Sequence, residues 1–493
     1  MKVAFIYSTF ENIGIECISS MLKKEGHKTQ LFFDPQLFDD ILFSNKLLGR
    51  AFSYKNNIIK QVVKSKPDII LFSVVSADYK WACEYAKKIK QQIDTKIIFG
   101  GMHITSVPDI VIKHDFIDYI VIGEGEFAIV DLLRSIESGK PDYSIKNVWF
   151  KKDGSVIKNP VRPLIKDLDK LPYPDKELYR KHGEPFITGY TMQAVRGCPN
   201  RCTYCNHDIY KRYYSPESST YIRERSIKNM IAELKDSYDK YKYKYIRFFD
   251  DDFLRDHKRL EEFSKGYNKE VNMPYTCIAH PDSITEEIIQ WLKLSNCRQV
   301  NVGFQNVDEK IRINILNRKE KNEDAIRSIK ILKKEKIRCI VDCMMGIPSS
   351  DARNMEETFK FFYNNIPTRL FMPWLQYFPR TKMCNIAQEH GIISEEKKRQ
   401  IELDPYNKSI ITMDKTVHNT KIMKYQTLFV SLLVSKKLAW ILHKTGLYKI
   451  IPSRSALFLN IIAYMKAWSP YEHEQVRSPK RYISFMMKKV FGV

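Results

Sequence analysis

Three cysteines are the residues of this sequence whose spacing points most directly to chemistry. Cys198, Cys202 and Cys205 lie within RGCPNRCTYCNH at C-x3-C-x2-C spacing, while the other cysteines are scattered. A tight loop can aim three thiolates inward, where they can hold three irons of a cubane cluster and leave the fourth iron open to a ligand. The alternatives are incidental cysteines and a structural zinc site, which takes four protein ligands; only His207 is near enough in sequence to be the fourth.

Carboxylates crowd the end of an apolar run further along the chain. The segment YIRFFDDDF places Asp250, Asp251 and Asp252 in succession after a predicted strand. Such a cluster could bind an ammonium group of a ligand. The alternative is a solvated acidic turn that caps the following helix.

Two glycine-containing loops, GGMHITSVP and GEGE, each follow a predicted strand nearer the N-terminus. Glycines in such loops let the backbone come close to a bulky cofactor. The candidate cofactor-binding residues of these loops are Gly100, Gly101, His103, Thr105, Gly123, Glu124 and Glu126.

The elements that must position the first of these groups alternate regularly. Short apolar runs such as KVAFIYS and DYIVIGEGE are separated by helical patterns such as IGIECISSMLKKEGH. This rhythm predicts a doubly wound parallel sheet, a Rossmann-like domain, over residues 1–145. NVWFKKDGSVIKNP is typical of a hairpin turning at Asp153-Gly154, and a proline-rich stretch follows, so we expect a hairpin and linker over residues 146–184.

A second alternation follows the linker. The predicted strands cover residues 191–195, 245–250, 275–280, 299–304, 337–344 and 370–378. Eight such units close a TIM-type barrel, so six predict a partial (β/α)6 barrel over residues 185–395, with its active site at the carboxyl ends of the strands. Helical patterns dominate the remaining residues, 396–493. The predicted fold class is therefore α/β.

In this context the cysteine motif, with the aromatic Tyr204 before its third cysteine, resembles the radical S-adenosylmethionine (SAM) superfamily. The resemblance implies a four-iron four-sulfur cluster on the three cysteines. It implies that the open iron binds S-adenosylmethionine and that the reduced cluster cleaves it to a 5′-deoxyadenosyl radical. It also implies that Tyr204 and the Asp250–Asp252 cluster lie at the cofactor, the latter at the methionine amino group.

Three later segments resemble the same family. VNVGFQNVDEK resembles the fourth-strand segment that many relatives write as G-x-E-S, with Gln305 in place of the glutamate. MMGIPSS resembles the family's G-x-P turn, where Gly346 would let the backbone approach the ligand. QYFPRTKMCNIA resembles a late-barrel segment and carries Arg380 where glycine is usual.

The glycine loops upstream of this motif resemble the cobalamin-binding domain that is fused to one large class of radical SAM enzymes. The D-x-H-x-x-G motif of many cobalamin proteins is absent, and the first loop, STFENIG, has no histidine. The resemblance therefore implies cobalamin bound without a protein histidine ligand. A domain that kept the fold and lost the cofactor is the alternative.

The activity implied by the resemblance is methylation of an unactivated carbon. One S-adenosylmethionine would yield the radical that removes a substrate hydrogen, methylcobalamin would deliver the methyl group, and a second S-adenosylmethionine would re-methylate the cobalt. An alternative with the same cofactors is oxidative ring closure, as in the anaerobic magnesium-protoporphyrin cyclase. An alternative from another class is a noncatalytic sensor that binds zinc and a small ligand.

The formal net charge of +23 is concentrated toward the C-terminus, where residues 415–493 hold fourteen Lys and Arg against two Glu. No nucleic-acid-binding motif accompanies it, so nucleic acid is not an expected partner. The apolar runs YQTLFVSLLV and SALFLNIIAYMKAW are too short to span a bilayer. They are consistent with contact to an anionic membrane surface or, as we prefer, with a helical cap over the barrel mouth.

The remaining expectations concern partners and compartment. The implied partners are a small-molecule substrate and an external electron donor of the flavodoxin or ferredoxin type. The N-terminus MKVAFIYS lacks the long apolar segment of a signal peptide, and the cysteines do not suggest a disulfide framework. We therefore expect a cytoplasmic protein, with peripheral membrane contact as the variant.

Overall fold

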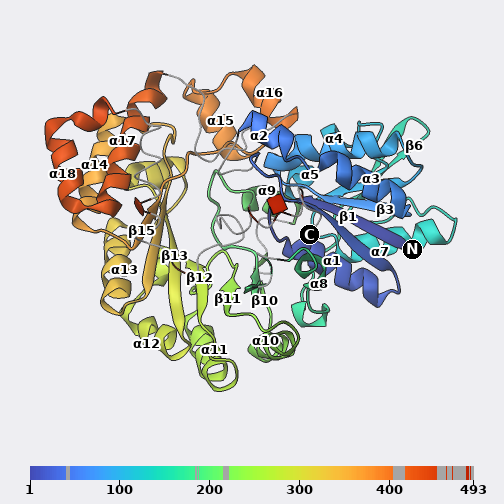
Figure 1. The fold of residues 1–493 in the computed structure, drawn as a ribbon, viewed down its shortest axis with the longest axis horizontal. Coiled ribbons are helices and arrows are strands. Elements are labelled where there is room, and N and C mark those ends of the chain that lie inside the picture. The colour runs from blue at the N-terminus through green and yellow to red at the C-terminus, as the bar shows by residue number, and fades with distance from the viewer. Residues whose placement is uncertain are drawn as a thin grey trace.

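The computed structural model describes residues 1–39, 45–183, 186, 188–214, 221–403 and 417–451, together with 462–463, 469, 483, 485–487 and 489. Figure 1 shows two α/β lobes, one built from the blue and cyan N-terminal segments and the other from the green to orange segments. The predicted α/β fold class is confirmed.

The first lobe is built on a seven-stranded sheet with strand order β2-β1-β3-β4-β5-β6-β7. Its strands are β1 (Lys2–Ser8), β2 (Lys28–Asp34), β3 (Ile69–Ser73), β4 (Lys96–Gly100), β5 (Tyr119–Val121), β6 (Val148–Lys152) and β7 (Ser155–Lys158). The first five are parallel, and the predicted hairpin, β6 and β7, adds two antiparallel strands at the edge. The hairpin therefore extends the first sheet.

Helices cover both faces of this sheet, as a doubly wound arrangement requires. Val3 and Phe5 of β1 pack in a core with α1 (Ile13–Lys24) and α7 (Glu126–Glu137), whereas Ala4 and Ile6 pack in a second core with α3 (Lys55–Ser65) and α4 (Tyr79–Lys90). Strands buried on both faces explain why the parallel part of the sheet reads as continuous apolar runs.

The second lobe is a six-stranded parallel sheet with strand order β15-β14-β13-β12-β11-β8. Its strands are β8 (Gly189–Met192), β11 (Tyr245–Phe248), β12 (Tyr275–Ala279), β13 (Cys297–Gln305), β14 (Arg338–Cys343) and β15 (Arg369–Phe371). The helices between them are α10 (Ile227–Tyr241), α11 (His257–Glu270), α12 (Glu286–Leu294), α13 (Asn322–Lys334) and α14 (Ala352–Asn364). The partial barrel predicted from six strand signals is confirmed.

Two predicted strands differ most from the structure. The strand predicted over 191–195 ends at Met192, because the Asp250 carboxylate accepts the backbone N–H groups of Ala194 and Val195 and the chain leaves the barrel sheet. Residues after that point form β9 (Val195–Arg196), which pairs antiparallel with β10 (Arg223–Glu224). The strand predicted over 370–378 is only Arg369–Phe371.

Beyond the barrel the described chain is helical. It contains α15 (Lys382–Glu389), α16 (Glu395–Leu403), α17 (Val417–Val434) and α18 (Lys436–Thr445). α17 packs against α14, and Leu428, Phe429 and Leu432 join the core of the barrel. SALFLNIIAYMKAW lies almost entirely outside the described residues. The domain boundaries at 145, 184 and 395 stay predictions.

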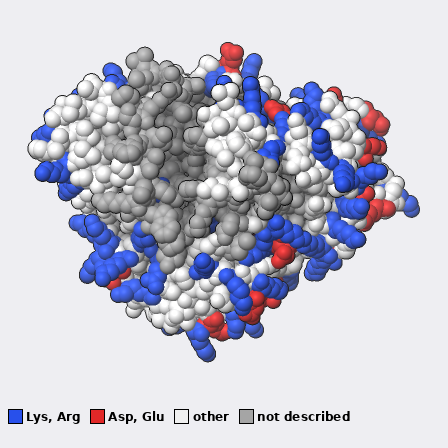
Figure 2. Space-filling view, in the orientation of Figure 1, with Lys and Arg blue, Asp and Glu red and all other residues white. Residues whose placement is uncertain are grey.

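The distribution of surface charge bears on the question of nucleic-acid binding, and the helices bear on the question of membrane contact. In Figure 2, Lys and Arg side chains spread over both lobes on the visible face and do not gather in one stripe. Within the described part of the chain, no helix is long and apolar enough to cross a membrane.

Candidate active site

The cysteine loop, residues 198–205, lies between β9 and α9 (His207–Tyr213) and is anchored to the barrel. Thr203 donates its backbone N–H to the carbonyl of Leu316 over 3.2 Å and its hydroxyl to the carbonyl of Ile315 over 2.6 Å. The carbonyl of Thr203 accepts the N–H of Met383 at the start of α15, over 2.9 Å. The middle of the loop is therefore fixed from two sides.

The loop brings its three thiols together. Cys198 and Cys202 are buried, Cys205 is partly buried, and none of them forms a disulfide. Burial raises the pKa of Cys198 to about 12 and that of Cys205 to about 11, and the neighbouring cysteines and Asp251 add to both shifts. Metal binding must therefore displace thiol protons at neutral pH.

The donor set of the loop matches the ligand count of a cubane. Three cysteines leave one iron of a cubane without a protein ligand, whereas a structural zinc site takes four protein ligands. His207, the candidate fourth ligand, has Nδ1 2.7 Å from the hydroxyl of Tyr221 and Nε2 2.9 Å from Asp251. The cysteine loop therefore fits a cubane better than the zinc of the sensor hypothesis.

Arg318 is a residue of this site that the sequence reasoning missed. Its guanidinium is 5% exposed and lies 3.9 Å from the Cys202 sulfur and 3.3 Å from the Tyr204 hydroxyl. It also lies 3.1 Å from Nδ1 of His280 and pairs with Glu320. A fixed cation beside a cysteine stabilises its thiolate. No local pattern marked it, because Tyr204 and Arg318 are 114 positions apart.

The three consecutive aspartates have different surroundings. Asp250 is fully buried beneath β8 and β9, and burial raises its pKa to about 7. Asp252 accepts the hydroxyl of Ser283 over 2.7 Å, and burial raises its pKa to about 6. Asp251 is exposed, pairs with His207 over 2.9 Å and acts electrostatically on Cys198. Of the three, Asp251 is the one that the structure places at the cysteine loop.

The predicted cofactor contacts from the later strands lie at the carboxyl ends of β13 and β14. Gln305 ends β13 at a register shift, with φ of 74°, and its carbonyl accepts the N–H of Met344 over 2.7 Å. Gly346 follows β14 with φ of 72°. Tyr204 packs in a small apolar cluster that includes Met344. Their contacts with a cofactor stay predictions.

The first glycine loop of the N-terminal sheet is closely packed. Gly100 ends β4, and Gly101 has φ of 99°, where a Cβ would lie 2.7 Å from the backbone nitrogen of Val74. His103, on α5 (Met102–Ser106), is fully buried with Nδ1 3.1 Å from the hydroxyl of Ser76. Burial lowers the pKa of His103 to about 3, so its imidazole is neutral.

The second loop, residues 123–126, follows β5 and is tied to the first. The hydroxyl oxygen of Thr105 accepts the N–H of Gly123 over 3.0 Å. The carboxylates of Glu124 and Glu126 pair with Arg196 of β9, two positions before the first cysteine. The two candidate cofactor loops of the first sheet thus lie together, and one of them contacts the segment that leads into the cysteine loop.

Large apolar side chains remain uncovered at the carboxyl ends of both sheets. Val75 follows β3, Phe127 is the second residue of α7 and Phe249 follows β11; they are 39%, 40% and 49% exposed. Ligands of α/β sheets bind at this end of the strands, and their pockets are mostly apolar. Val75 and Phe127 therefore fit a large ring such as a corrin lying over the first sheet.

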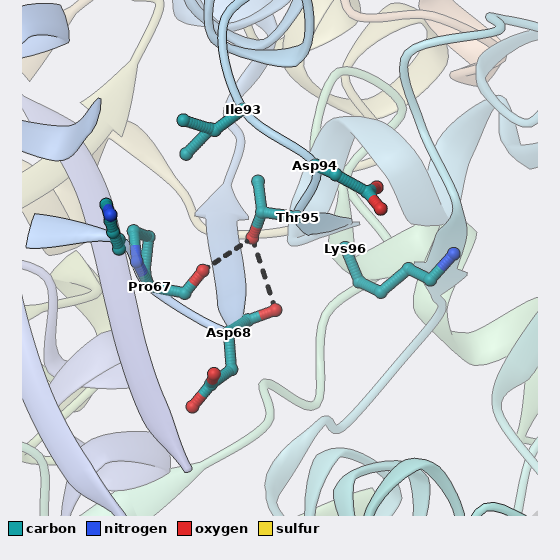
Figure 3. A pocket seen from close by; sticks show the side chains of 7 residues that line it. Pro67, Asp68, Ile93, Asp94, Thr95 and Lys96 are labelled. Atoms are coloured by element: carbon teal, nitrogen blue, oxygen red, sulfur yellow. Dashed lines mark hydrogen bonds between the residues drawn. The ribbon is translucent and has the colours of Figure 1, made fainter. Parts of the chain in front are cut away.

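A cavity of about 470 Å³ lies elsewhere, beside the amino ends of β3 and β4 (Figure 3). It is lined by Lys66, Pro67, Asp68, Ile93, Asp94, Thr95 and Lys96. The hydroxyl of Thr95 donates to the carbonyl of Pro67 over 2.9 Å and so ties two of its walls together. Since it lies at the opposite strand end from Gly100, it is not part of the candidate active site.

Comparison with known proteins agrees with the geometry. The family model of the radical SAM superfamily matches residues 192–362, and that of the B12 binding domain matches residues 3–133. An uncharacterized methyltransferase of Pyrococcus horikoshii is 26% identical over 414 residues, covering 80% of this chain and 83% of that protein. The anaerobic magnesium-protoporphyrin IX monomethyl ester cyclase of Rubrivivax gelatinosus is 23% identical over 437 residues, covering 83% and 72%.

Solved structures share the fold at low identity. The radical SAM methyltransferase TsrM of Kitasatospora setae, with cobalamin and a [4Fe-4S] cluster bound, has a TM-score of 0.62 at 15% identity and covers 79% of this chain and 75% of that chain. The cobalamin-dependent SAM radical enzyme OxsB, with aqua-cobalamin bound, has a TM-score of 0.65 at 15% identity and covers 99% and 80%.

The cofactors follow from the two matched families. A radical SAM domain implies a four-iron four-sulfur cluster and S-adenosylmethionine, and the B12-binding domain supports cobalamin. The cysteine loop and the uncovered carboxyl ends of the strands fit these groups. The chain is therefore a radical SAM enzyme that carries an N-terminal B12-binding domain.

Proposed function

We propose that this enzyme is a cobalamin-dependent radical SAM methyltransferase that methylates an unactivated carbon of a small-molecule substrate. One observation carries the proposal: the cysteine loop and the candidate cobalamin loops are joined directly. Arg196 precedes the cysteine loop and pairs with Glu124 and Glu126, and Tyr213 after the loop donates its hydroxyl to the carbonyl of Thr105 over 3.0 Å. Both cofactors would therefore act on one substrate between the two lobes.

The chain's own residues would divide the work as follows. Cys198, Cys202 and Cys205 would hold the cluster, and Arg318 would stabilise the negative charge at Cys202. Asp251, exposed beside Cys198, is the carboxylate best placed to orient the ammonium group of S-adenosylmethionine. When bound, the cluster and cobalamin supply radical formation and methyl transfer, whereas the protein positions the reactants and excludes water and oxygen.

The proposal also covers the electron donor and the cellular compartment. An external donor of the flavodoxin or ferredoxin type would deliver the electron that the cluster needs. We place the enzyme in the cytoplasm, where free thiols such as these stay reduced.

Methyl transfer can be tested without knowing the substrate. Enzyme reconstituted anaerobically with iron, sulfide and hydroxocobalamin would be incubated with dithionite, S-adenosylmethionine deuterated in its methyl group and small molecules extracted from anaerobically grown cells. We expect 5′-deoxyadenosine together with a product that carries the labelled methyl group, both detected by mass spectrometry. A substrate-derived product that is oxidised but unlabelled would contradict methylation and favour ring closure, the chemistry of the cyclase relative.

The matched variants separate cluster loss from general damage. Cys202→Ala should lose iron, sulfide and 5′-deoxyadenosine. Cys277→Ala, which changes a buried cysteine of β12 away from the loop, should keep all three. Loss of 5′-deoxyadenosine in both variants alike would contradict the assignment of the cluster to the cysteine loop.

A further inference from the structure

The cysteine loop is held at both of its ends by a single loop of the first sheet. We call residues 123–126 the glutamate loop. On the upstream side, Arg196 places Nη1 3.3 Å from Oε1 of Glu124 and Nη2 2.7 Å from Oε1 of Glu126. On the downstream side, the hydroxyl oxygen of Tyr214, one residue beyond α9, accepts the backbone N–H of Glu124 over 3.1 Å. The glutamate loop thus contacts the chain both before and after the three cysteines.

Both carboxylates are engaged in largely buried ion pairs. Oε1 of Glu124 also lies 2.7 Å from Nη1 of Arg223, on the strand that pairs with β9, and its Oε2 accepts the N–H of Ile165 over 3.0 Å. The side chains of these ion pairs are only 7–16% exposed. Charge-assisted hydrogen bonds of this kind contribute about 1.5–3 kcal/mol each. Both glutamates therefore form ion pairs with arginines of the neighbouring lobe.

The backbone of the glutamate loop is shaped for the same contact. Gly123 has φ of 71°, and a Cβ at this position would lie 1.9 Å from the hydroxyl oxygen of Tyr214. Any other residue would displace the side chain of Tyr214 and would have to adopt a left-handed backbone conformation. Glycine is required here by close contact with the other lobe, which differs from the close approach to a cofactor expected from the GEGE pattern.

We infer that Glu124 and Glu126 are positioning residues which, through Arg196 and Tyr214, set the place of the cysteine loop relative to the carboxyl edge of the first sheet. They are not cofactor ligands. The fork of Arg196 reaches both carboxylates at once, one through each terminal nitrogen. The inference rests on the proposed function, because this spacing matters to the reaction only where cluster and cobalamin act together.

The first test needs no cofactor. Hydrogen exchange of peptides that cover residues 198–205 would be compared between the wild-type protein and Glu124→Gln/Glu126→Gln, both free of cobalamin. We expect exchange of the cysteine loop to rise at least about tenfold in the variant, because local opening there no longer has to break the ion pairs that Glu124 and Glu126 make with Arg196 and Arg223. Glu389→Gln, at an exposed glutamate that ends α15, should leave exchange unchanged.

The second test reads the spacing in the holoenzyme. After reconstitution with iron, sulfide and hydroxocobalamin, electron paramagnetic resonance would measure how far the reduced cluster accelerates relaxation of the Co(II) signal. This dipolar effect falls steeply with distance. We expect the double variant to keep its iron and cobalt contents and to lose part of the acceleration.

The outcomes separate the alternatives. Loss of cobalt with an intact cluster would make the glutamates cofactor contacts and overturn the inference, as would wild-type exchange and relaxation in the double variant. If that variant fails to fold, Gly123→Ala, which displaces Tyr214 and leaves both carboxylates in place, decides by the same readouts. A wild-type protein that binds no cobalamin would defeat the proposed function, and the exchange experiment would still test the positioning role.

Discussion

At the scale of single residues, the aspartate cluster shows how far the site could be predicted from the sequence. The cluster consists of Asp250, Asp251 and Asp252. The position of the carboxylate cluster at a strand end was predictable from the apolar run before it. Which carboxylate reaches the cysteine loop was not, because Asp250 turns inward to the N–H groups of Ala194 and Val195, more than fifty positions away. Arg318 was missed for the same reason, since Cys202, Tyr204 and His280 lie in other loops, 38 to 116 positions away.

The buried Asp250 predicts a distinctive dependence of stability on pH. Its folded pKa of about 7 exceeds the unfolded value of about 3.9, so between these values the folded state binds the proton and the unfolded state does not. Stability from this group is therefore present at low pH and lost as pH rises toward 7. Asp250→Asn removes the titration and should gain roughly 2–3 kcal/mol relative to wild type between pH 5 and pH 8.

Thermal unfolding of the apoprotein at the two pH values would measure this difference. The change in a variant's offset from wild type between the two pH values cancels the fixed cost of the buried amide. Asp239→Asn, at an exposed position of α10, should show the same offset from wild type at both pH values. An offset for Asp250→Asn that does not grow with pH would show that the carboxylate is ionised throughout this range.

At the scale of elements, the strands of both sheets were predictable because parallel strands buried on two faces read as apolar runs. β9 and β10 were not, since two-residue strands carry no periodic signal. The turn before α15 shows a further limit. Arg380, where the resemblance expects glycine, keeps φ of 60° and uses its side chain to bind Asp109 of the first lobe through contacts of 2.6 and 2.9 Å.

The Arg380 turn predicts an order of stability among three proteins. Arg380→Ala loses the ion pair and keeps a left-handed backbone, whereas Arg380→Gly loses the same pair but relieves about 1 kcal/mol of backbone strain. We expect the glycine variant to unfold a few degrees above the alanine variant and close to wild type, because a half-exposed pair contributes at most about 1 kcal/mol.

Thermal midpoints of the purified apoproteins would establish this order. Asp109→Asn, which removes the partner and leaves the turn unchanged, isolates the ion pair and should lie near wild type. Equal midpoints for the alanine and glycine variants would show that residue 380 is not held in the left-handed region.

At the scale of the whole molecule, the two lobes are joined by buried charge in a segment whose composition predicted only a linker. Lys176 lies 3.0 Å from Glu11 and 2.6 Å from Glu16, and all three side chains are at most 6% exposed. Glu11 in turn accepts the hydroxyl of Thr191 on β8 over 2.6 Å. Prolines indicated a break in regular structure, but they gave no sign of the ion pairs that fix the lobes together.

The last prediction concerns this junction. Burial opposes the charge of Lys176, yet Glu11 and Glu16 raise its pKa above its usual value, so the cation compensates two buried carboxylates. Lys176→Met leaves them uncompensated, at a cost of roughly 3–5 kcal/mol, which lowers the thermal midpoint by several degrees at pH 8. Burial already raises the pKa of Glu16, and loss of the cation raises that pKa further, so the deficit should narrow at pH 5 as Glu16 binds a proton. Differential scanning calorimetry at both pH values measures this loss of stability, with exposed Lys170→Met as the control that should match wild type.

A loss of stability that is absent, or equal at both pH values, would show that the lobes do not depend on the charge of Lys176. Partial recovery in Lys176→Met/Glu16→Gln would trace the loss to the buried carboxylates.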